Sequence, residues 1–274
     1  MKKVFAIALA ALMLVGMLAG CSGAKKEVLT VALSPDFAPM EFVDATKTGQ
    51  DKYVGFDVSL AKYIADELGM ELEIKPMSFD ACQTAVALGN VSMSISGFSW
   101  TEDRAENYNL SDYYWAGDNE SEQTLITLAD NAGKYTTAES LAGLKVGAQT
   151  ASLQESLCKE QLPDCELVVV ADLTTALMQL RNGDFDVMAV AKGNADAIIA
   201  SNPDIGLSGF FFEVDEKYTG NVVLLNKESD DLTAKVNEIL AKAEAAGYYT
   251  TWYDEAKAIA GIEVSYDDAG NELS

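Results

Sequence analysis

The sequence predicts an α/β protein built from two lobes, each around a mainly parallel sheet. Three observations carry this prediction. Short apolar runs alternate with stretches of helical spacing. This alternation occurs over residues 28–95 and again over residues 144–190. Extended apolar segments at 123–128 and 221–225 lie where the chain could pass between the two halves. One continuous doubly wound sheet is the alternative interpretation of the same pattern.

The first half alternates strands with helices. Apolar runs predict strands at 28–33, 71–74 and 91–95, and apolar residues at helical spacing predict helices at 56–68 and 80–88. Gly69 and Gly89 directly follow the two helices, and a glycine in the left-handed region commonly ends a helix. The predicted order is therefore strand, helix, strand, helix, strand.

The second half repeats this order. Strands are predicted at 144–148, 167–170 and 185–190, with helices at 153–161 and 173–181. A long helical pattern at 230–249 follows the second extended segment. If both extended segments cross, residues 28–122 and 222–274 form lobe 1 and residues 123–221 form lobe 2. Two crossings make a hinge, and a cleft between open sheets faces the carboxyl ends of their strands.

The first residues predict export. Lys2 and Lys3 precede an apolar run at 4–18, which is short for a membrane span and typical of a signal peptide, here residues 1–20. The run ends in Leu18-Ala19-Gly20-Cys21, which resembles the lipobox of bacterial lipoproteins. The resemblance implies a lipid on Cys21, a lipid-anchored tether at 21–27, and an extracytoplasmic protein held at the membrane. The alternative is an ordinary signal peptide with a chance cysteine.

Composition excludes two kinds of partner. The chain carries 43 acidic and 19 basic residues, a formal net charge of −24, and so would be repelled by nucleic acid. It has no histidine, and its cysteines are not spaced as zinc ligands, so we expect no metal and no cofactor. Cys82 stands at an apolar helical position and is predicted to be a buried thiol. Whether Cys158 and Cys165 form a local disulfide after export is left open.

Several stretches of the chain carry recognisable motifs. They are Tyr53–Lys62 (YVGFDVSLAK), Leu88–Val91 (LGNV), Thr101–Arg104 with Asn109–Asp112, Leu180–Asp186 (LRNGDFD) and Tyr249–Tyr253 (YTTWY). Together they resemble the family-3 extracellular solute-binding proteins, the receptors of polar amino-acid ABC importers. The resemblance implies two α/β lobes joined by two hinge strands, the periplasmic-binding-protein type II fold. It also implies a monomer that binds an amino acid or related small carboxylate and delivers it to ABC transporter permease subunits.

Arg104 is the first candidate for the binding site. It follows the strand predicted at 91–95, on the side where a cleft would open, and a guanidinium can pair with a carboxylate through two parallel hydrogen bonds. The resemblance assigns the ligand's carboxylate to this arginine. A surface arginine paired with Glu102 or Asp103 is the structural alternative.

Further positions complete the predicted site. They lie in the loop before Arg104, at the start of the helix at 153–161, at two aromatic positions and at the end of a strand: Gly97, Phe98 and Ser99; Gln149, Ala151 and Ser152; Phe37 and Phe79; and Ala191. The amino end of a helix attracts an anion, and aromatic side chains suit the wall of a pocket. Ser152 could equally serve only as the helix N-cap.

Ala191 marks a departure from the family. It occupies the position at which the resemblance implies an aspartate for the ligand's α-ammonium, and alanine supplies no charge. Burying an ammonium without a carboxylate costs several kcal/mol. Either another acid, such as Asp36 or Asp196, takes over this role, or the ligand lacks the ammonium.

Binding is favoured over catalysis. The sequence has no histidine, no nucleophile elbow and no glycine-rich phosphate loop. The family also includes cyclohexadienyl dehydratase-like enzymes, which the resemblance implies would need an acid near position 191. Such an enzyme and a ligand-sensing subunit are the two alternatives to a transport receptor.

Overall fold

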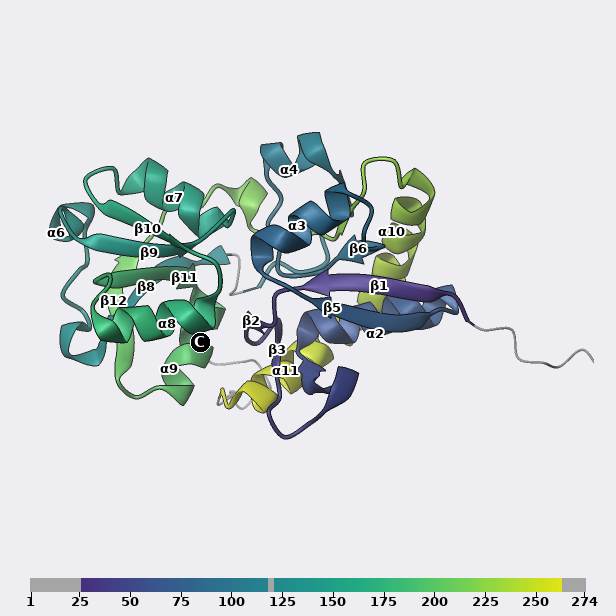
Figure 1. Cartoon of the computed structure of the whole chain (residues 1–274), viewed down its shortest axis with the longest axis horizontal. Helices are drawn as coiled ribbons and strands as arrows, with labels where there is room; N and C mark the ends of the chain where they lie inside the picture. The colour runs from purple at the N-terminus through teal and green to yellow at the C-terminus, as the bar shows by residue number, and fades with distance from the viewer. Residues whose placement is uncertain (1–25, 118–120, 263–274) are drawn as a thin grey trace, which may run out of the picture.

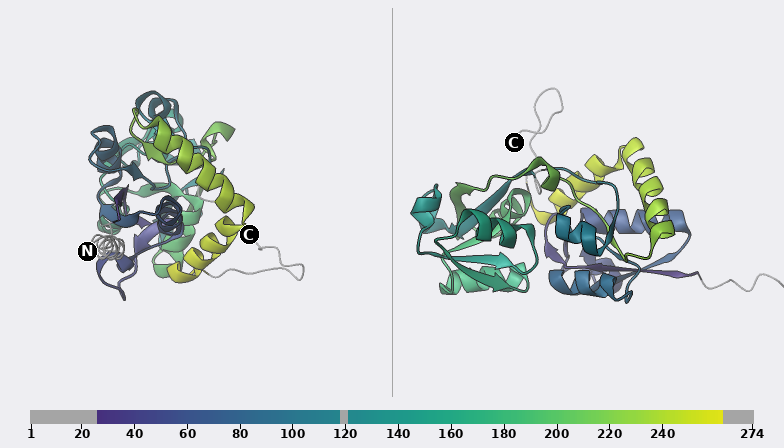
Figure 2. Two further views of the ribbon diagram at one scale, coloured as in Figure 1. Left: turned by 90° about the vertical axis from the view of Figure 1, so that its right-hand side faces the viewer. Right: turned by 90° about the horizontal axis from the view of Figure 1, so that it is seen from above.

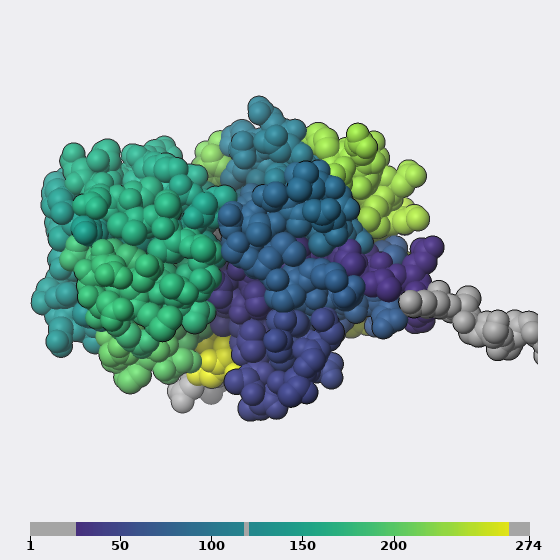
Figure 3. Space-filling model, viewed as in Figure 1, coloured from purple at the N-terminus to yellow at the C-terminus, as the bar shows by residue number. Residues whose placement is uncertain are grey.

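The computed structural model describes residues 26–117 and 121–262, which form two lobes that lie side by side (Figure 1). Each lobe contains a five-stranded sheet. The space-filling view shows the two lobes in contact along one boundary (Figure 3). The predicted α/β class with two lobes is therefore confirmed. The predicted signal peptide and the lipidation site Cys21 lie outside the described residues.

The first sheet has the strand order β5–β1–β6–β13–β7. Its strands are β5 (Glu71–Pro76), β1 (Val28–Leu33), β6 (Met93–Ser94), β13 (Leu224–Leu225) and β7 (Asn109–Leu110). β1 is parallel to β5 and β6, whereas β13 is antiparallel to β6 and β7. Its helices are α2 (Phe56–Leu68), α10 (Asp230–Ala245) and α11 (Tyr248–Ala260) on one face and α3 (Phe79–Ala87) on the other. The short α4 (Glu102–Asn107) follows β6.

The second sheet has the order β10–β9–β11–β8–β12. Its strands are β10 (Glu166–Val170), β9 (Lys145–Gln149), β11 (Val187–Ala191), β8 (Gln123–Leu128) and β12 (Ile205–Phe211). β9 is parallel to β10 and β11, and β8 is antiparallel to β11 and β12. Its helices are α7 (Leu153–Gln161), α8 (Leu173–Asn182), α9 (Lys192–Ser201) and the short α6 (Ala138–Leu141).

Alternation along β11 builds a core on both faces of the second sheet. Val187 and Ala189 belong to the cluster that contains residues of α7, whereas Met188 and Val190 belong to the cluster that contains residues of α8 and α9. Successive side chains of a strand point to opposite faces, so an uninterrupted apolar run is what a strand covered on both sides requires.

The crossings between the lobes differ from the predicted ones. The segments predicted to cross, 123–128 and 221–225, lie mostly inside sheets, as β8 in the second sheet and β13 in the first. The chain passes from the first sheet to the second between β7 and β8, and returns between β12 and β13. The two crossing segments bind each other where Asn221 N donates to Trp115 O at 2.6 Å and Tyr114 N donates to Asn221 O at 3.0 Å. An extended apolar run fits a sheet interior as well as it fits a hinge, so the pattern alone could not separate them.

A small three-stranded sheet, which the sequence analysis does not predict, connects β1 to α2. Its strands are β2 (Asp36–Phe37), β3 (Glu41–Val43) and β4 (Tyr53–Val54), in that order, followed by Gly55. Gly55 has φ of 120°, and a Cβ atom there would lie 2.3 Å from the Met40 carbonyl oxygen. Only glycine fits this close approach, so the first turn of α2 packs directly beside β3.

The pattern at 230–249, predicted as one helix, belongs to two helices. Gly247 adopts φ of 72° between α10 and α11, and the two helices meet at an angle (Figure 2). The turn directs Tyr249, Trp252 and Tyr253 toward Phe56 of α2, with ring centroids 5.8 to 6.3 Å apart. Helical periodicity on both sides of a glycine does not reveal such a change of direction.

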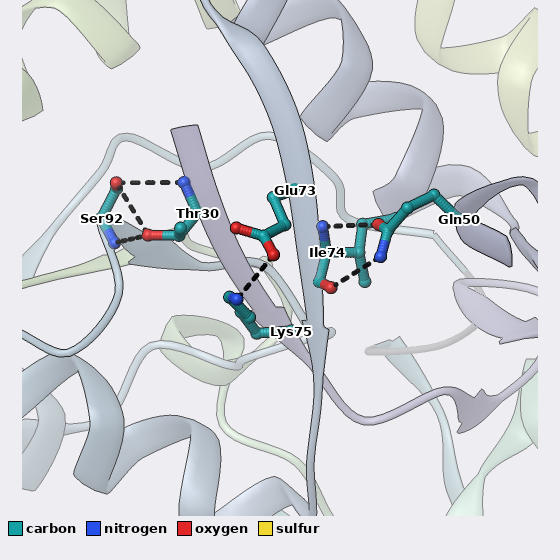
Figure 4. A network of polar contacts seen from close by, with 6 residues as sticks. All are labelled: Thr30, Gln50, Glu73, Ile74, Lys75 and Ser92. Carbon is teal, nitrogen blue, oxygen red and sulfur yellow. Dashed lines mark hydrogen bonds and ion pairs between the residues drawn. The ribbon is translucent and has the colours of Figure 1, made fainter. Parts of the chain in front are cut away.

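Side chains complete the hydrogen bonding of the first sheet (Figure 4). At the edge strand β5, Ile74 N donates to Gln50 Oε1 at 2.8 Å, and Gln50 Nε2 donates to Ile74 O at 3.3 Å. Gln50 thereby covers backbone groups that could otherwise pair with another chain. Ser92 and Thr30 exchange hydrogen bonds of 2.9 to 3.2 Å, which extend the short pairing of β1 with β6.

The cysteines within the described residues are free thiols. Cys82 is buried, as predicted, and burial raises its pKa to about 12. The local disulfide between Cys158 and Cys165 is not formed, and the Cys165 thiol donates to the Leu141 carbonyl oxygen at 3.2 Å. None of the helices in the described ranges combines the length and apolarity needed to cross a bilayer.

Candidate ligand-binding site

A cavity lies between the lobes at the carboxyl ends of β1, β6 and β9. It holds about 470 Å³ of space not filled by protein atoms, its mouth included. Its lining comes from both lobes: Ser34, Asp36, Phe37, Glu41, Phe79, Ser96, Gly97, Ser99 and Arg104 from the first, and Gln149, Ser152, Leu153, Gln154, Leu173, Ala189 and Val190 from the second. The strand order of both sheets reverses beside this point, where open α/β sheets bind ligands.

Arg104 reaches the cavity from α4 and is 3% exposed. Its Nη1 atom donates to the Ser99 carbonyl oxygen at 2.6 Å, and its Nη2 atom donates to the Ala151 carbonyl oxygen at 2.9 Å. Ala151 belongs to the second lobe, so this arginine connects the two lobes. The surface alternative does not hold, because Glu102 forms its ion pair with Lys217 instead.

Two aromatic rings support the guanidinium of Arg104. Its Cζ atom lies 5.5 Å from the ring centroid of Phe79 and 5.2 Å from that of Phe98, and the two rings stack with centroids 4.6 Å apart. Phe79 lines the cavity, whereas Phe98 is fully buried and is absent from the lining. A cation held over aromatic faces is attracted by their quadrupoles, so the rings orient Arg104 without neutralising it.

The start of α7 forms the opposite wall. Ser152 is the N-cap, with its Oγ atom accepting from Glu155 N at 3.1 Å, and it also lines the cavity. Glu155 in turn accepts from Ala151 N at 2.6 Å. Ala151 has φ of 60°, in the left-handed region, and presents its carbonyl group rather than its side chain toward Arg104. Arg104 and the helix start therefore meet across the cavity.

Phe37 and Ala191 occupy different environments. Phe37 lines the cavity and packs against apolar clusters of both lobes. Ala191 is fully buried at the end of β11 and does not line the cavity, where its neighbours Ala189 and Val190 do. The alanine at position 191, where the family resemblance implies an aspartate, therefore leaves an apolar strand end beside the cavity.

Two carboxyl groups line the cavity where Ala191 supplies none. Asp36 accepts from Ser34 Oγ at 2.7 Å and from the backbone nitrogen of Leu173, in the second lobe, at 2.6 Å. Asp196, the other acid considered from the sequence, pairs with Lys192 at 2.6 Å and is not part of the lining. Of these two acids, only Asp36 lines the cavity.

Glu41 is a lining residue that the sequence analysis misses. It is fully buried on β3 and accepts a hydrogen bond from Ser96 Oγ. Behind it, Asp57 of α2 is equally buried and accepts from Gly97 N at 2.7 Å and from the Tyr114 hydroxyl at 3.0 Å. The available signal was an acid inside the apolar stretch Met40–Val43, where a solvated side chain is not expected.

Burial determines the protonation of these acids. Removal from water raises the pKa of Asp36, raises that of Asp57 to about 7, and raises that of Glu41 well above its ordinary value. The cavity thus combines one arginine with acidic groups that ionise less readily than surface acids. Such a site can bind a molecule that carries both a carboxylate and a cationic group.

Comparison with known proteins agrees with this geometry. The family described as bacterial extracellular solute-binding proteins, family 3, matches residues 29–256. The arginine-binding extracellular protein ArtP of Bacillus subtilis (strain 168) is 29% identical over 232 residues, which cover 82% of this chain and 84% of that protein.

Solved structures share the whole two-lobed fold. The amino acid ABC transporter substrate-binding protein AbpA from Streptococcus pneumoniae Canada MDR_19A, bound to L-arginine, is 32% identical with a TM-score of 0.77, covering 86% of this chain and 96% of that chain. An ancestral arginine-binding protein bound to glutamine is 27% identical with a TM-score of 0.74, covering 85% and 98%. This chain, whose two lobes both fall within the matched range, belongs to family 3 of the bacterial extracellular solute-binding proteins.

Proposed function

We propose that this protein is a receptor that captures an amino acid with a cationic side chain, L-arginine being the first candidate, for an ABC importer. The observation that carries the proposal is one cavity, lined by both lobes, that contains a buried arginine together with the carboxyl groups of Asp36 and Glu41. Similar proteins named or solved as arginine-binding support the choice of ligand.

The ligand's carboxylate binds Arg104 in this proposal. Arg104 Nη2 now donates to the neutral carbonyl oxygen of Ala151. A carboxylate accepts stronger, charge-assisted hydrogen bonds from a guanidinium, so it can take the place of that carbonyl group. Gly97, Ser99, Gln149 and Ser152 offer polar groups around the same point, and Phe37 and Phe79 provide apolar walls.

The cationic groups of the ligand bind the acidic side of the cavity. Asp36 and Glu41 lie on the small sheet of lobe 1 and both line the cavity. An ammonium or guanidinium buried there would be compensated by these carboxyl groups despite the alanine at 191. These carboxyl groups support a ligand that retains its α-ammonium.

Closure of the lobes around the ligand would produce the form that an importer recognises. We propose that residues 28–122 with 222–274 move as one lobe and 123–221 as the other, about the crossing segments that meet at Trp115 and Asn221. A ligand that contacts both lobes favours the closed state in proportion to its differential affinity. The importer's permease subunits are the proposed partners, with the receptor acting as a monomer and not as an enzyme.

A panel of matched ligands tests this function. Titration calorimetry with L-arginine, citrulline and agmatine separates the two ends of the ligand, because citrulline lacks the cationic side chain and agmatine lacks the carboxylate. We expect L-arginine to bind most tightly and both analogues to bind on the order of tenfold or more weakly, which is about 1.4 kcal/mol. Equal binding of agmatine and L-arginine would contradict the role given to Arg104, and binding confined to acids without an amino group would contradict the cationic ligand.

Arg104→Lys tests the arginine itself. Lysine keeps the positive charge but loses the planar pair of donors, so we expect the affinity for L-arginine to fall on the order of 10- to 100-fold. Arg181→Lys is the matched control, since Arg181 pairs with Asp204 on the surface of lobe 2. Loss of affinity in both variants, or in neither, would count against the assignment.

Attachment to the membrane is a separate part of the proposal. The signal peptide at 1–20 and the lipobox ending at Cys21 support a lipid anchor followed by the tether at 21–27. When cells expressing the full-length chain are extracted with Triton X-114, the parent protein should enter the detergent phase and Cys21→Ala the aqueous phase. The same distribution for both would contradict lipid attachment.

A further inference from the structure

A buried pair of carboxyl groups stands directly behind the ligand cavity. Glu41 of β3 lines the cavity, and Asp57 lies in the first turn of α2; both side chains are fully buried. The close packing at Gly55 and the hydrogen bond from Asp57 N to Met40 O at 2.9 Å hold the two elements together. The pair is therefore fixed by the backbone and does not depend on flexible side chains.

The contacts of the pair favour a bound proton. Ser96 Oγ donates to Glu41 Oε1, while Gly97 N and the Tyr114 hydroxyl donate to the two oxygens of Asp57. Glu41 Oε2 is buried without a hydrogen-bond partner among the described residues, and repulsion from Asp57 raises the pKa of Glu41 further. A buried, ionised carboxylate with an unpaired oxygen is costly, so the pair is more stable when Glu41 is protonated.

The surroundings of the pair lack a balancing cation. Desolvation is the largest effect on the pKa of both groups, and neither carboxyl takes part in the ion pairs of the described residues. The titratable neighbours are Asp36 on β2 and the Tyr114 hydroxyl, and Arg104 faces Glu41 only across the cavity. Like charges held close in a low dielectric ionise one at a time.

We propose that Glu41 and Asp57 form a proton-binding site linked to ligand capture, which presents one negative charge to a cationic ligand when it holds a single proton and none when it holds two. In the singly charged form Glu41 holds the proton and Asp57 is ionised. Asp57 is a positioning residue, because it acts on the ligand only through Glu41 and through the Gly97 loop. Acidification then weakens the site for a cation. The choice of a cationic ligand rests on the proposed function, whereas proton binding by Glu41 and Asp57 does not.

The pH range follows from the burial of the pair. Because burial raises the pKa of Asp57 to about 7, the second proton binds as the pH falls below about 7. Binding of one proton that competes with a cation lowers affinity by at most about tenfold for each pH unit. A ligand-binding profile that is flat at high pH and falls on the acidic side is expected.

The first experiment measures the dissociation constant of L-arginine by titration calorimetry between pH 5.5 and 8.5. The affinity of the parent should fall by up to about tenfold per pH unit below about pH 7. Asp57→Asn, which removes the titrating group, should lose most of this slope. Asp66→Asn on the exposed side of the same helix should keep it. A slope equal in the parent and in Asp57→Asn would overturn the coupling to ligand capture.

A second measurement needs no ligand. Both acids have ordinary pKa values near 4 in the unfolded chain, so the folded protein holds more protons between about pH 4 and 7. The pair's contribution to stability is therefore present at low pH and is lost as the pH rises through this range. The melting temperature should fall more from pH 5 to pH 8 in the parent than in Asp57→Asn. If that variant fails to fold, Glu41→Gln serves in its place for this readout.

The two measurements test the proposed function and the proton site independently of each other. If L-arginine binds at no pH, the proposed function is wrong, and the melting profiles still decide whether the proton site exists. Identical melting profiles for the parent, Asp57→Asn and Glu41→Gln would overturn the proton site, whatever the ligand proves to be.

Discussion

Arg104 illustrates how far a single residue can be understood from its neighbours in sequence. Its type and its place after β6 predict a role in the cleft, and the cavity contains it. Its partners come from elsewhere: the Ala151 carbonyl group from the other lobe and the ring of Phe79 from α3. Glu41 is the opposite case, since the apolar residues beside it indicate burial but do not place it in the cavity. For both residues, the environment of the side chain depends on contacts with residues distant in sequence.

Ala151 allows a prediction at the residue scale. Its φ of 60° places an alanine in the left-handed region, which costs a side-chain-bearing residue about 1–2 kcal/mol, while glycine loses about 0.5–1 kcal/mol more backbone entropy on folding. Ala151→Gly should therefore raise the free energy of unfolding by up to about 1 kcal/mol, measured by urea denaturation. Ala234→Gly in the second turn of α10 should lower it by about 1 kcal/mol. Destabilisation by both substitutions would show that Ala151 is not strained.

The boundaries of long helices were predicted more accurately than those of short strands. α2 and α7 have the boundaries that helical spacing predicts. Gly69 ends α2 in the left-handed region as expected, and Gly183 ends α8 in the same way. The two-residue strands β7 and β13 and the small sheet β2–β3–β4 were missed or displaced, because two or three residues cannot display a period. The break at Gly247 was missed because apolar spacing is helical on both sides, and only packing against Phe56 sets the new direction.

Two contacts bridge the lobes outside the proposed ligand contacts. Asn194 of α9 is buried, and its Nδ2 atom donates to the Ala38 carbonyl oxygen of lobe 1 at 3.0 Å. On the other side of the cleft, Lys217 of the second crossing pairs with Glu102 at 2.6 Å. In the proposed mechanism the ligand binds a closed state, so each such contact contributes to affinity through the population of that state.

Asn194→Ala tests this link at the scale of the molecule. Loss of one buried hydrogen bond, about 0.5–1.5 kcal/mol, should weaken ligand affinity roughly 2- to 10-fold without touching the cavity, since Asn194 is not part of its lining. Small-angle scattering of the ligand-free protein should show a larger radius of gyration than the parent. Asn202→Ala, whose side chain binds only within lobe 2, is the control. Parent-like affinity in Asn194→Ala would show that this contact does not govern closure.

The sequence by itself determined the two-lobed α/β class, the family, and the arginine of the cavity, because periodicity, caps and motifs are written in residues close along the chain. Only the tertiary structure decided that Asp36 rather than Asp196 lines the cavity, that Glu41 lines it as well, and that Glu41 and Asp57 are buried close together. Those facts depend on backbone segments brought together by folding, such as β3 against the first turn of α2. Desolvation, which sets the charge of these acids, exists only once the surrounding chain has excluded water.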